Sequence, residues 1–87
     1  INLLAVPGTP LSAVRRAMSH TVLLGQCRSF LRTHGLTAVT GADTAGSARM
    51  VAERGDPALA ALASDLAGEI YGLDVLARQI EDQANNT

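Results

Sequence analysis

The chain has 87 residues, 47% of them hydrophobic, and a formal net charge of −1. A protein of this length buries only about 60–65% of the surface of its unfolded chain, so we expect one small domain or one lobe of a larger domain. The charge gives no reason to expect nucleic acid as a partner. No apolar segment approaches transmembrane length and no signal segment opens the chain, so we expect no membrane contact and a cytoplasmic location.

The first part of the chain predicts two strands. Residues 1–6 form an apolar run that is typical of a buried strand, and the turn-forming residues 7–10 end it. Residues 11–15 predict no more than a single helical turn. A second strand then runs through Ala17 and Met18 into Ser19.

The next segment predicts one helix from about Thr21 to His34, with Ser19 as its N-cap and Gly35 as its stop. Gln26 follows Ser19 by seven residues, or nearly two helical turns, so both polar groups are expected on one side of the helix. If that side lines a cleft, it forms an anion site together with the amides of the first turn. Apolar side chains recur at spacings of three and four along the same segment: Leu23, Leu24, Cys27, Phe30 and Leu31.

Strands and helices continue to alternate beyond Gly35. Residues 36–40 predict a strand, and residues 45–54 predict a helix that Asp43 or Thr44 caps and Gly55 ends. Helix propensity alone predicts one long helix over residues 58–72. A short final strand over residues 73–77 precedes a polar, turn-rich end. The alternation predicts an α/β fold with a mostly parallel sheet, flanking helices, and helix starts that meet at one sheet edge.

Most individual polar side chains have a simple structural interpretation. Cys27 falls in the apolar stripe and is interpreted as a core thiol. His34 suits a helix C-terminus, where the dipole favours a cation. We interpret Glu81 and Asp82 as a solvated turn, and Arg28 and Arg32 as surface charges that share a helix face. No metal site is predicted.

Four elements of the sequence resemble the prephenate dehydratase family, in the same order. The family signature Ser-His-Pro-Gln-Ala-Leu-x-Gln-Cys is matched by residues 19–27, with Thr21, Val22 and Leu23 as departures. Residues 3–11 resemble its Leu-Leu-Ala-x-Pro-Gly-Thr-x-Leu stretch, and residues 43–48 its Ser/Thr-Ala-x-Ala-Ala element. Residues 60–64 and 67–73 resemble a family strand and the helix after it. The resemblance therefore replaces the single long helix by a strand and a helix, with Ser64 as cap and Gly72 as stop.

The resemblance implies that residues 1–87 form the second lobe of a periplasmic-binding-protein-like (type II) two-lobed domain. The first lobe and any regulatory ACT region are then absent from this chain, which also lacks an initiator Met and is expected to be a fragment. The expected partners are prephenate, the N-terminal lobe of the same protein and a second copy in a homodimer.

The family reaction removes carbon dioxide and hydroxide from prephenate to give phenylpyruvate in phenylalanine biosynthesis, and the resemblance implies no metal or organic cofactor. It implies substrate contacts by Ser19 and Gln26. The end of the chain resembles the approach to an Asn-x-Thr-Arg-Phe motif, so Thr87 is either its essential Thr or the residue just before it. The further candidate substrate contacts are His20, Thr44, Ser64 and Asn86.

Two alternatives stay open at this point. The departures at residues 21–23 are compatible with a prephenate decarboxylase of secondary metabolism, which loses carbon dioxide and keeps the hydroxyl group. A lobe without its other half is also compatible with a non-catalytic ligand-binding protein. Ser19 is equally well explained as a structural cap, Gln26 as a solvated helix residue and His20 as an exposed residue at a helix start.

Overall fold

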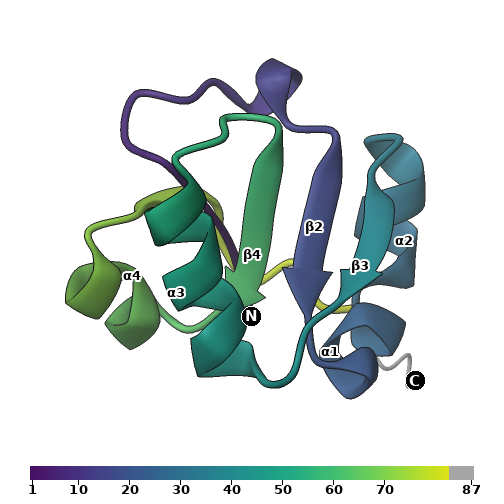
Figure 1. The fold of residues 1–87 in the computed structure, drawn as a ribbon. Coiled ribbons are helices and arrows are strands. Elements are labelled where there is room, and N and C mark those ends of the chain that lie inside the picture. Colours follow the sequence, from purple (N-terminus) through teal and green to yellow (C-terminus); the bar gives the residue numbers. More distant parts are fainter. Residues whose placement is uncertain (83–87) are drawn as a thin grey trace.

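The computed structural model describes residues 1–82 and shows a sheet with helices on both faces (Figure 1). The strands are β1 (Asn2–Ala5), β2 (Arg16–Ser19), β3 (Thr37–Thr40), β4 (Leu59–Ala63) and β5 (Asp74–Ala77). The helices are α1 (Thr21–Gln26), α2 (Arg28–Thr33), α3 (Thr44–Arg54) and α4 (Asp65–Tyr71), with a 3-10 turn, η1 (Leu11–Ala13). No helix in residues 1–82 is both long and apolar enough to cross a membrane.

The five strands lie in the order β3-β2-β4-β1-β5. The strand β2 pairs in parallel with β3 and β4, whereas β1 is antiparallel to both β4 and β5. The predicted α/β class with flanking helices is confirmed, and four of the five strands run in the same direction as predicted; β1 runs the opposite way, so the sheet is mixed. The prediction missed the direction of β1 because a strand buried on both faces is apolar throughout, whichever way it runs.

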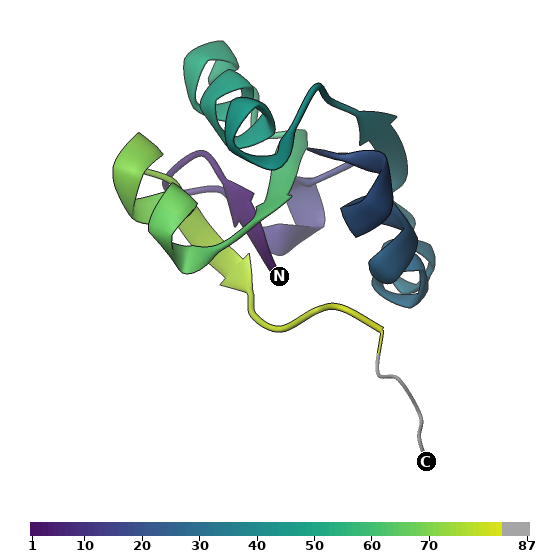
Figure 2. The same cartoon turned by 90° about the horizontal axis from the view of Figure 1, so that it is seen from below.

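Successive side chains of each strand point to opposite faces and so build two apolar cores. Helices α1 and α2 cover one face, together with the chain that leads to Ile80, and α3 and α4 cover the other (Figure 2). The first core contains Leu3, Ala17, Leu24, Cys27, Leu31, Leu36, Leu62 and Ile80 among its buried residues. The second contains Leu4, Met18, Ala48, Val51, Leu59, Ala61, Ala67 and Leu73.

The ends of α3 and α4 agree with the sequence. The Asp43 carboxylate accepts a hydrogen bond from the Gly46 amide at the start of α3, and Gly55 ends that helix with a φ of 62°. At the start of α4 the Ser64 hydroxyl accepts from the Ala67 amide at 3.3 Å. The division of residues 58–72 into a strand and a helix at Ser64 is therefore confirmed.

The predicted helix over residues 21–34 is instead two helices, α1 and α2, which meet at Cys27 (φ −118°, ψ 24°). In one continuous helix the Ser29 N–H and the Gln26 carbonyl would be bonded within that helix. Here the Ser29 N–H donates to Asp82 Oδ1 at 3.1 Å, and the Gln26 carbonyl accepts from the Asp82 N–H. A distant residue thus replaces the local hydrogen bonds at the break.

Two glycines are expected to respond oppositely to alanine. In Gly41→Ala the new Cβ would lie 2.2 Å from Ser47 Oγ and 3.1 Å from Met18 Cγ, and Ser47 is itself held by a hydrogen bond to the Asp43 carbonyl. We expect a loss of about 1–3 kcal/mol in the free energy of unfolding. In Gly25→Ala nothing lies within 4 Å of the new Cβ, so we expect a gain of roughly 0.4–1 kcal/mol. Chemical denaturation of both variants tests these two predictions. An unchanged denaturation midpoint for Gly41→Ala would contradict the predicted loss of stability.

Candidate functional site

Three helix starts lie along one edge of the sheet. The strands β3, β2 and β4 are adjacent and mutually parallel, so their carboxyl ends share an edge, at the bottom of Figure 1. His20, Asp43 and Ser64 are the N-cap residues of the helices α1, α3 and α4 that follow them. The common edge predicted for these helix starts is confirmed, and the three strand ends span roughly 10 Å at the usual strand spacing.

The chain leaves the neighbouring strands β2 and β4 toward opposite faces. Helix α1 packs in the core on one face and α4 in the core on the other, as the view from below shows (Figure 2). In open α/β sheets, ligands bind outside the carboxyl ends of strands at such a reversal. By this rule, the sheet edge between His20 and Ser64 is the candidate position for a ligand.

Ser19 is buried in the sheet next to His20, and it is not an N-cap. It is the last residue of β2, has 0% exposure, and its hydroxyl donates to the Leu62 carbonyl of β4 at 2.9 Å. The last backbone pair between these two strands is Met18↔Ala61, so the Ser19 side chain continues the link between the strands beyond it. The predicted cap was wrong because the hydroxyl has a partner in a strand that lies far away in the sequence.

His20 is the N-cap of α1. Its Nδ1 atom accepts a hydrogen bond from the Val22 N–H at 3.1 Å, and the residue is exposed. A neutral imidazole that accepts at Nδ1 carries its proton on Nε2. His20 therefore offers one N–H donor at the sheet edge.

The three helix starts differ in local charge. The start of α3 holds the carboxylate of Asp43, and the first turn of α4 contains Asp65. Helix α1 has no acidic residue in its first turn, and its cap is a histidine. Since a carboxylate offsets the positive end of a helix dipole, α1 is the start best suited to an anionic ligand.

Gln26 and Ser19 do not share one side of a helix as the sequence suggested. Ser19 belongs to β2 and is buried, whereas Gln26 is the last residue of α1 and its side chain is exposed. The Gln26 carbonyl is held by the Asp82 N–H. Gln26 therefore lies where the end of the described chain meets α1.

The chain after β5 is fixed by polar contacts that the sequence did not predict. Asn2 is 6% exposed, donates from Nδ2 to Asp65 Oδ1 at 2.8 Å and accepts from the Gln79 N–H at 3.0 Å. Asp65 also accepts from Arg78. The only signal in the sequence was a polar Asn2 within an otherwise apolar strand.

Asp82 is not part of a simply solvated turn as predicted, because both its N–H and its carboxylate bond the junction between α1 and α2. Figure 2 shows the chain running from β5 across to these helices. Asn86 and Thr87 lie outside the described residues, so their predicted roles stay predictions. The described chain ends at Asp82, beside Gln26.

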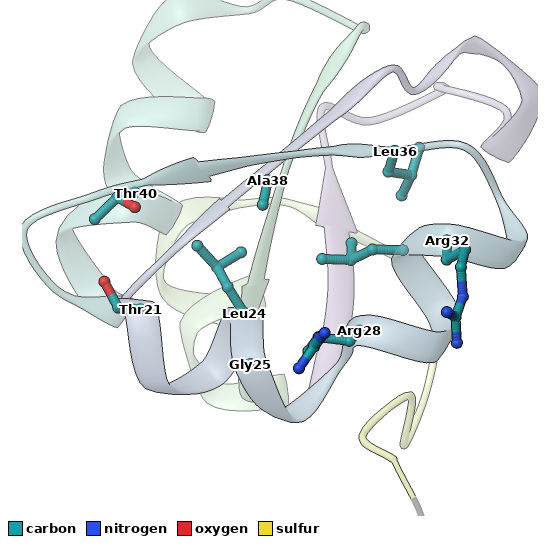
Figure 3. Close-up of a pocket in the computed structure, with 9 residues that line it drawn as sticks. Thr21, Leu24, Gly25, Arg28, Arg32, Leu36, Ala38 and Thr40 are labelled. Atoms are coloured by element: carbon teal, nitrogen blue, oxygen red, sulfur yellow. The ribbon is translucent and has the colours of Figure 1, made fainter.

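A groove of about 520 Å³ lies between α1–α2 and strand β3 (Figure 3). Thr21 and Thr40 lie at the end of this groove that reaches the sheet edge with the helix starts. Arg28 and Arg32, predicted to be surface charges, also line it. The other lining residues are Leu24, Gly25, Leu31, Leu36 and Ala38.

The family model described as prephenate dehydratase matches residues 1–87, the whole chain. The chain belongs to the prephenate dehydratase family. It is 44% identical over 85 residues to a bifunctional N-acyl-homoserine lactone acylase/prephenate dehydratase of Komagataeibacter europaeus, covering 98% of this chain and 30% of that protein. It is 39% identical over 88 residues to the bifunctional chorismate mutase/prephenate dehydratase of Neisseria gonorrhoeae, covering 99% of this chain and 24% of that protein.

Solved structures of prephenate dehydratases and related proteins share this fold. A prephenate dehydratase from Arthrobacter aurescens, in complex with L-Phe, superposes with a TM-score of 0.84 at 34% identity, covering 98% of this chain and 29% of that one. A structure described as GqqA, a quorum-quenching acylase, gives 0.92 at 43% identity, covering 93% and 30%. The chain therefore spans less than a third of the length of these relatives.

In this member of the prephenate dehydratase family, Cys27 is confirmed as a core thiol. It is fully buried, and burial raises the pKa of its thiol to about 11, with the nearby Glu81 carboxylate adding to the shift. The thiol is therefore protonated at neutral pH and a poor nucleophile. Residues 1–82 contain no group of three side chains placed to hold a metal ion.

Proposed function

We propose that this chain is the second lobe of a prephenate dehydratase catalytic domain. Completed by the rest of its protein, it removes carbon dioxide and hydroxide from prephenate to give phenylpyruvate. The observation that carries the proposal is the family match over the whole of residues 1–87. The 39% identity to a chloroplastic arogenate dehydratase/prephenate dehydratase of Arabidopsis thaliana supports a substrate of this kind.

The start of α1 is the place proposed for a substrate carboxylate. Prephenate carries two carboxylates, and a helix N-terminus stabilises an anion by about 0.3–1 kcal/mol, or more where the site is partly buried. His20 and Gln26 add N–H donors from the two ends of α1. Ser19, which is buried below them, is proposed to support this surface through its hydrogen bond to Leu62.

Thr44 and Ser64 are proposed to contact the uncharged part of the substrate. Thr44 adjoins the Asp43 carboxylate, which would repel an anionic group, and Ser64 adjoins Asp65, whose carboxylate is already paired with the Arg78 guanidinium. The hydroxyl groups of Thr44 and Ser64 can instead form hydrogen bonds with the alcohol group of prephenate. That group carries no charge until it departs as hydroxide. This division orients the substrate along the sheet edge.

Departure of hydroxide requires a proton or a strong hydrogen bond at the leaving oxygen. Thr87 is proposed to donate it, and Asn86 to contact the substrate beside it. The electrons of the C–CO₂⁻ bond form the aromatic ring as carbon dioxide and hydroxide leave. Because aromatisation drives this step, the reaction proposed here requires neither a metal ion nor an organic cofactor.

The proposal extends to the setting of the enzyme. We place it in the cytoplasm, in the branch of the shikimate pathway that leads to phenylalanine, and as a homodimer in which each copy is completed by its own first lobe. Size-exclusion chromatography with light scattering of the intact protein tests the dimer.

The relatives described above favour dehydration over the two alternatives from the sequence, since the names of several state dehydratase activity. The 44% identity to a bifunctional acylase/prephenate dehydratase adds N-acyl-homoserine lactone hydrolysis as a second candidate. The products separate these functions. Dehydration gives phenylpyruvate, decarboxylation alone keeps the hydroxyl group, and the acylase releases a fatty acid.

The deciding experiment incubates the intact protein with prephenate and follows phenylpyruvate by its absorbance in alkali. We expect turnover by the intact protein and none by residues 1–87 alone, because one lobe leaves the reacting groups open to water. A product that retains the hydroxyl group would replace the proposal by decarboxylation. Turnover by the 87-residue chain at the rate of the intact protein would contradict the two-lobed site.

A further inference from the structure

Arg78 follows directly on the carboxyl end of β5. Strand β5 is antiparallel to β1, and β1 is antiparallel to β4, so β5 runs in the same direction as β4. The carboxyl end of β5 therefore lies at the same sheet edge as the starts of α1, α3 and α4. Among the residues that directly follow the strands described in residues 1–82, Arg78 is the only arginine.

At this edge Arg78 pairs with the carboxylate of Asp65, in the first turn of α4. Its Nη1 atom donates to Asp65 Oδ1. The same oxygen accepts from Nδ2 of Asn2 at 2.8 Å, and Asn2 is 6% exposed at the start of β1, the strand between β4 and β5. In the view onto this edge, α4 lies beside the end of β5 (Figure 2). The Asp65 carboxylate is therefore turned toward the ends of the strands.

The pair of Arg78 and Asp65 is open to a ligand. The two side chains are 64% and 56% exposed, and both line a pocket of about 220 Å³ between α4 and β5. Glu69 lines this pocket too, but it lies one helical turn further along α4 and so further from the edge. Exposed ion pairs contribute little to stability. The main effect of Arg78 here is to cancel the charge of the carboxylate next to Ser64.

We propose that Arg78 is a specificity-determining residue, which masks the Asp65 carboxylate and thereby selects prephenate over arogenate. This inference rests on the proposed function, in which the substrate binds at this sheet edge. Ser64, the proposed contact of the substrate alcohol, directly precedes Asp65 in the chain. A substrate held by Ser64 would extend its side chain along the edge toward the pair.

The two substrates differ in one group of that side chain. Prephenate carries a keto oxygen where arogenate carries an ammonium group. An unpaired Asp65 carboxylate would attract the ammonium group and repel the electron-rich keto oxygen. Paired with Arg78, the carboxylate is neutralised, and the guanidinium N–H groups that Asp65 does not use can donate to the keto oxygen.

The test measures kcat/KM of the intact protein and its variants for prephenate and for arogenate, with thermal melting of each protein. We expect the parent to prefer prephenate. Arg78→Gln leaves the Asp65 charge unmasked and should shift the ratio of the two kcat/KM values toward arogenate by about tenfold or more, the usual effect of one close charge pair in a solvated site. Asp65→Asn keeps the oxygen that Asn2 and Arg78 contact and removes only the charge, so it should shift the ratio toward prephenate.

Arg49→Gln is the matched control. The Arg49 side chain is 67% exposed and pairs with Glu53 Oε2 at 3.0 Å in the interior of α3, away from the sheet edge. The substitution makes the same change in net charge as Arg78→Gln and breaks an ion pair of similar exposure. Its ratio of kcat/KM values should equal that of the parent, and all three variants should melt near the parent temperature.

An unchanged ratio in Arg78→Gln, or an equal shift in Arg49→Gln, would overturn the role of Arg78. A parent protein that prefers arogenate would also overturn it, although the protein would still be a dehydratase. If Arg78→Gln fails to fold, Asp65→Asn decides, and a ratio that stays constant or moves toward arogenate contradicts the proposal. If the parent turns over neither compound, the proposed function fails and this inference fails with it.

Discussion

Thr87→Ala in the intact protein is expected to lower kcat for prephenate by about 10²–10⁴-fold, the usual contribution of a group that donates a proton in the transition state. The hydroxyl acts on the departing oxygen, and its bond strengthens only as charge develops there. KM should therefore change little. Steady-state kinetics over a range of prephenate concentrations separates the two constants.

Thr87→Ser is the matched control for this prediction, because it keeps the hydroxyl group and removes only a methyl group. It should retain most of the activity, although the smaller side chain is held less firmly. Equal losses in Thr87→Ser and Thr87→Ala would show that packing and not proton donation is at stake. A loss of less than tenfold in Thr87→Ala would assign the donor to another residue of the motif.

Features that depend on neighbours in the sequence could be predicted correctly. The caps Asp43 and Ser64 bond to amides three residues ahead, and Gly55 and Gly72 end their helices in the left-handed conformation that glycine adopts without strain. The boundary between β4 and α4 is marked by the Ser64 cap, although the Ala and Leu residues around it have high helix propensity.

Features that depend on distant partners could not be predicted. The break at Cys27 is stabilised by Asp82, which lies 53 residues from Ser29. Ser19 looked like an N-cap because its partner, the Leu62 carbonyl, lies 43 residues away in another strand. In both cases a polar group has a local and a distant option, and tertiary packing decides between them.

The candidate site also combines features that could be predicted from the sequence with features that could not. The meeting of the helix starts at one edge follows from the alternation of strands and helices, and the sequence predicted it. The difference in charge between these starts depends on where the carboxylates lie, and the first turn of α1 contains none. The connection from Gln26 to Asp82 also arises only in the folded chain.

Gln26→Ala in the intact protein is expected to lower kcat/KM by about 10²–10³-fold, as for the loss of one preorganised donor to a developing or bound oxyanion. The substitution keeps the Gln26 carbonyl, so the bond from the Asp82 N–H remains and the free energy of unfolding should hardly change. Ser29→Ala, near the start of α2, keeps the amide that Asp82 uses and serves as the control with normal kinetics.

Ser19→Ala should show the opposite signature to Gln26→Ala. It leaves the buried Leu62 carbonyl without the hydroxyl that now donates to it, which is expected to cost about 1–3 kcal/mol in the free energy of unfolding. Its kcat/KM should fall less than that of Gln26→Ala, because the Ser19 hydroxyl is fully buried below the surface that would meet the substrate. Chemical denaturation and steady-state kinetics on the same preparations test both variants. Normal kcat/KM in Gln26→Ala would remove Gln26 from the substrate site, and a loss of 100-fold or more in a stable Ser19→Ala protein would show that the Ser19 hydroxyl turns toward the substrate.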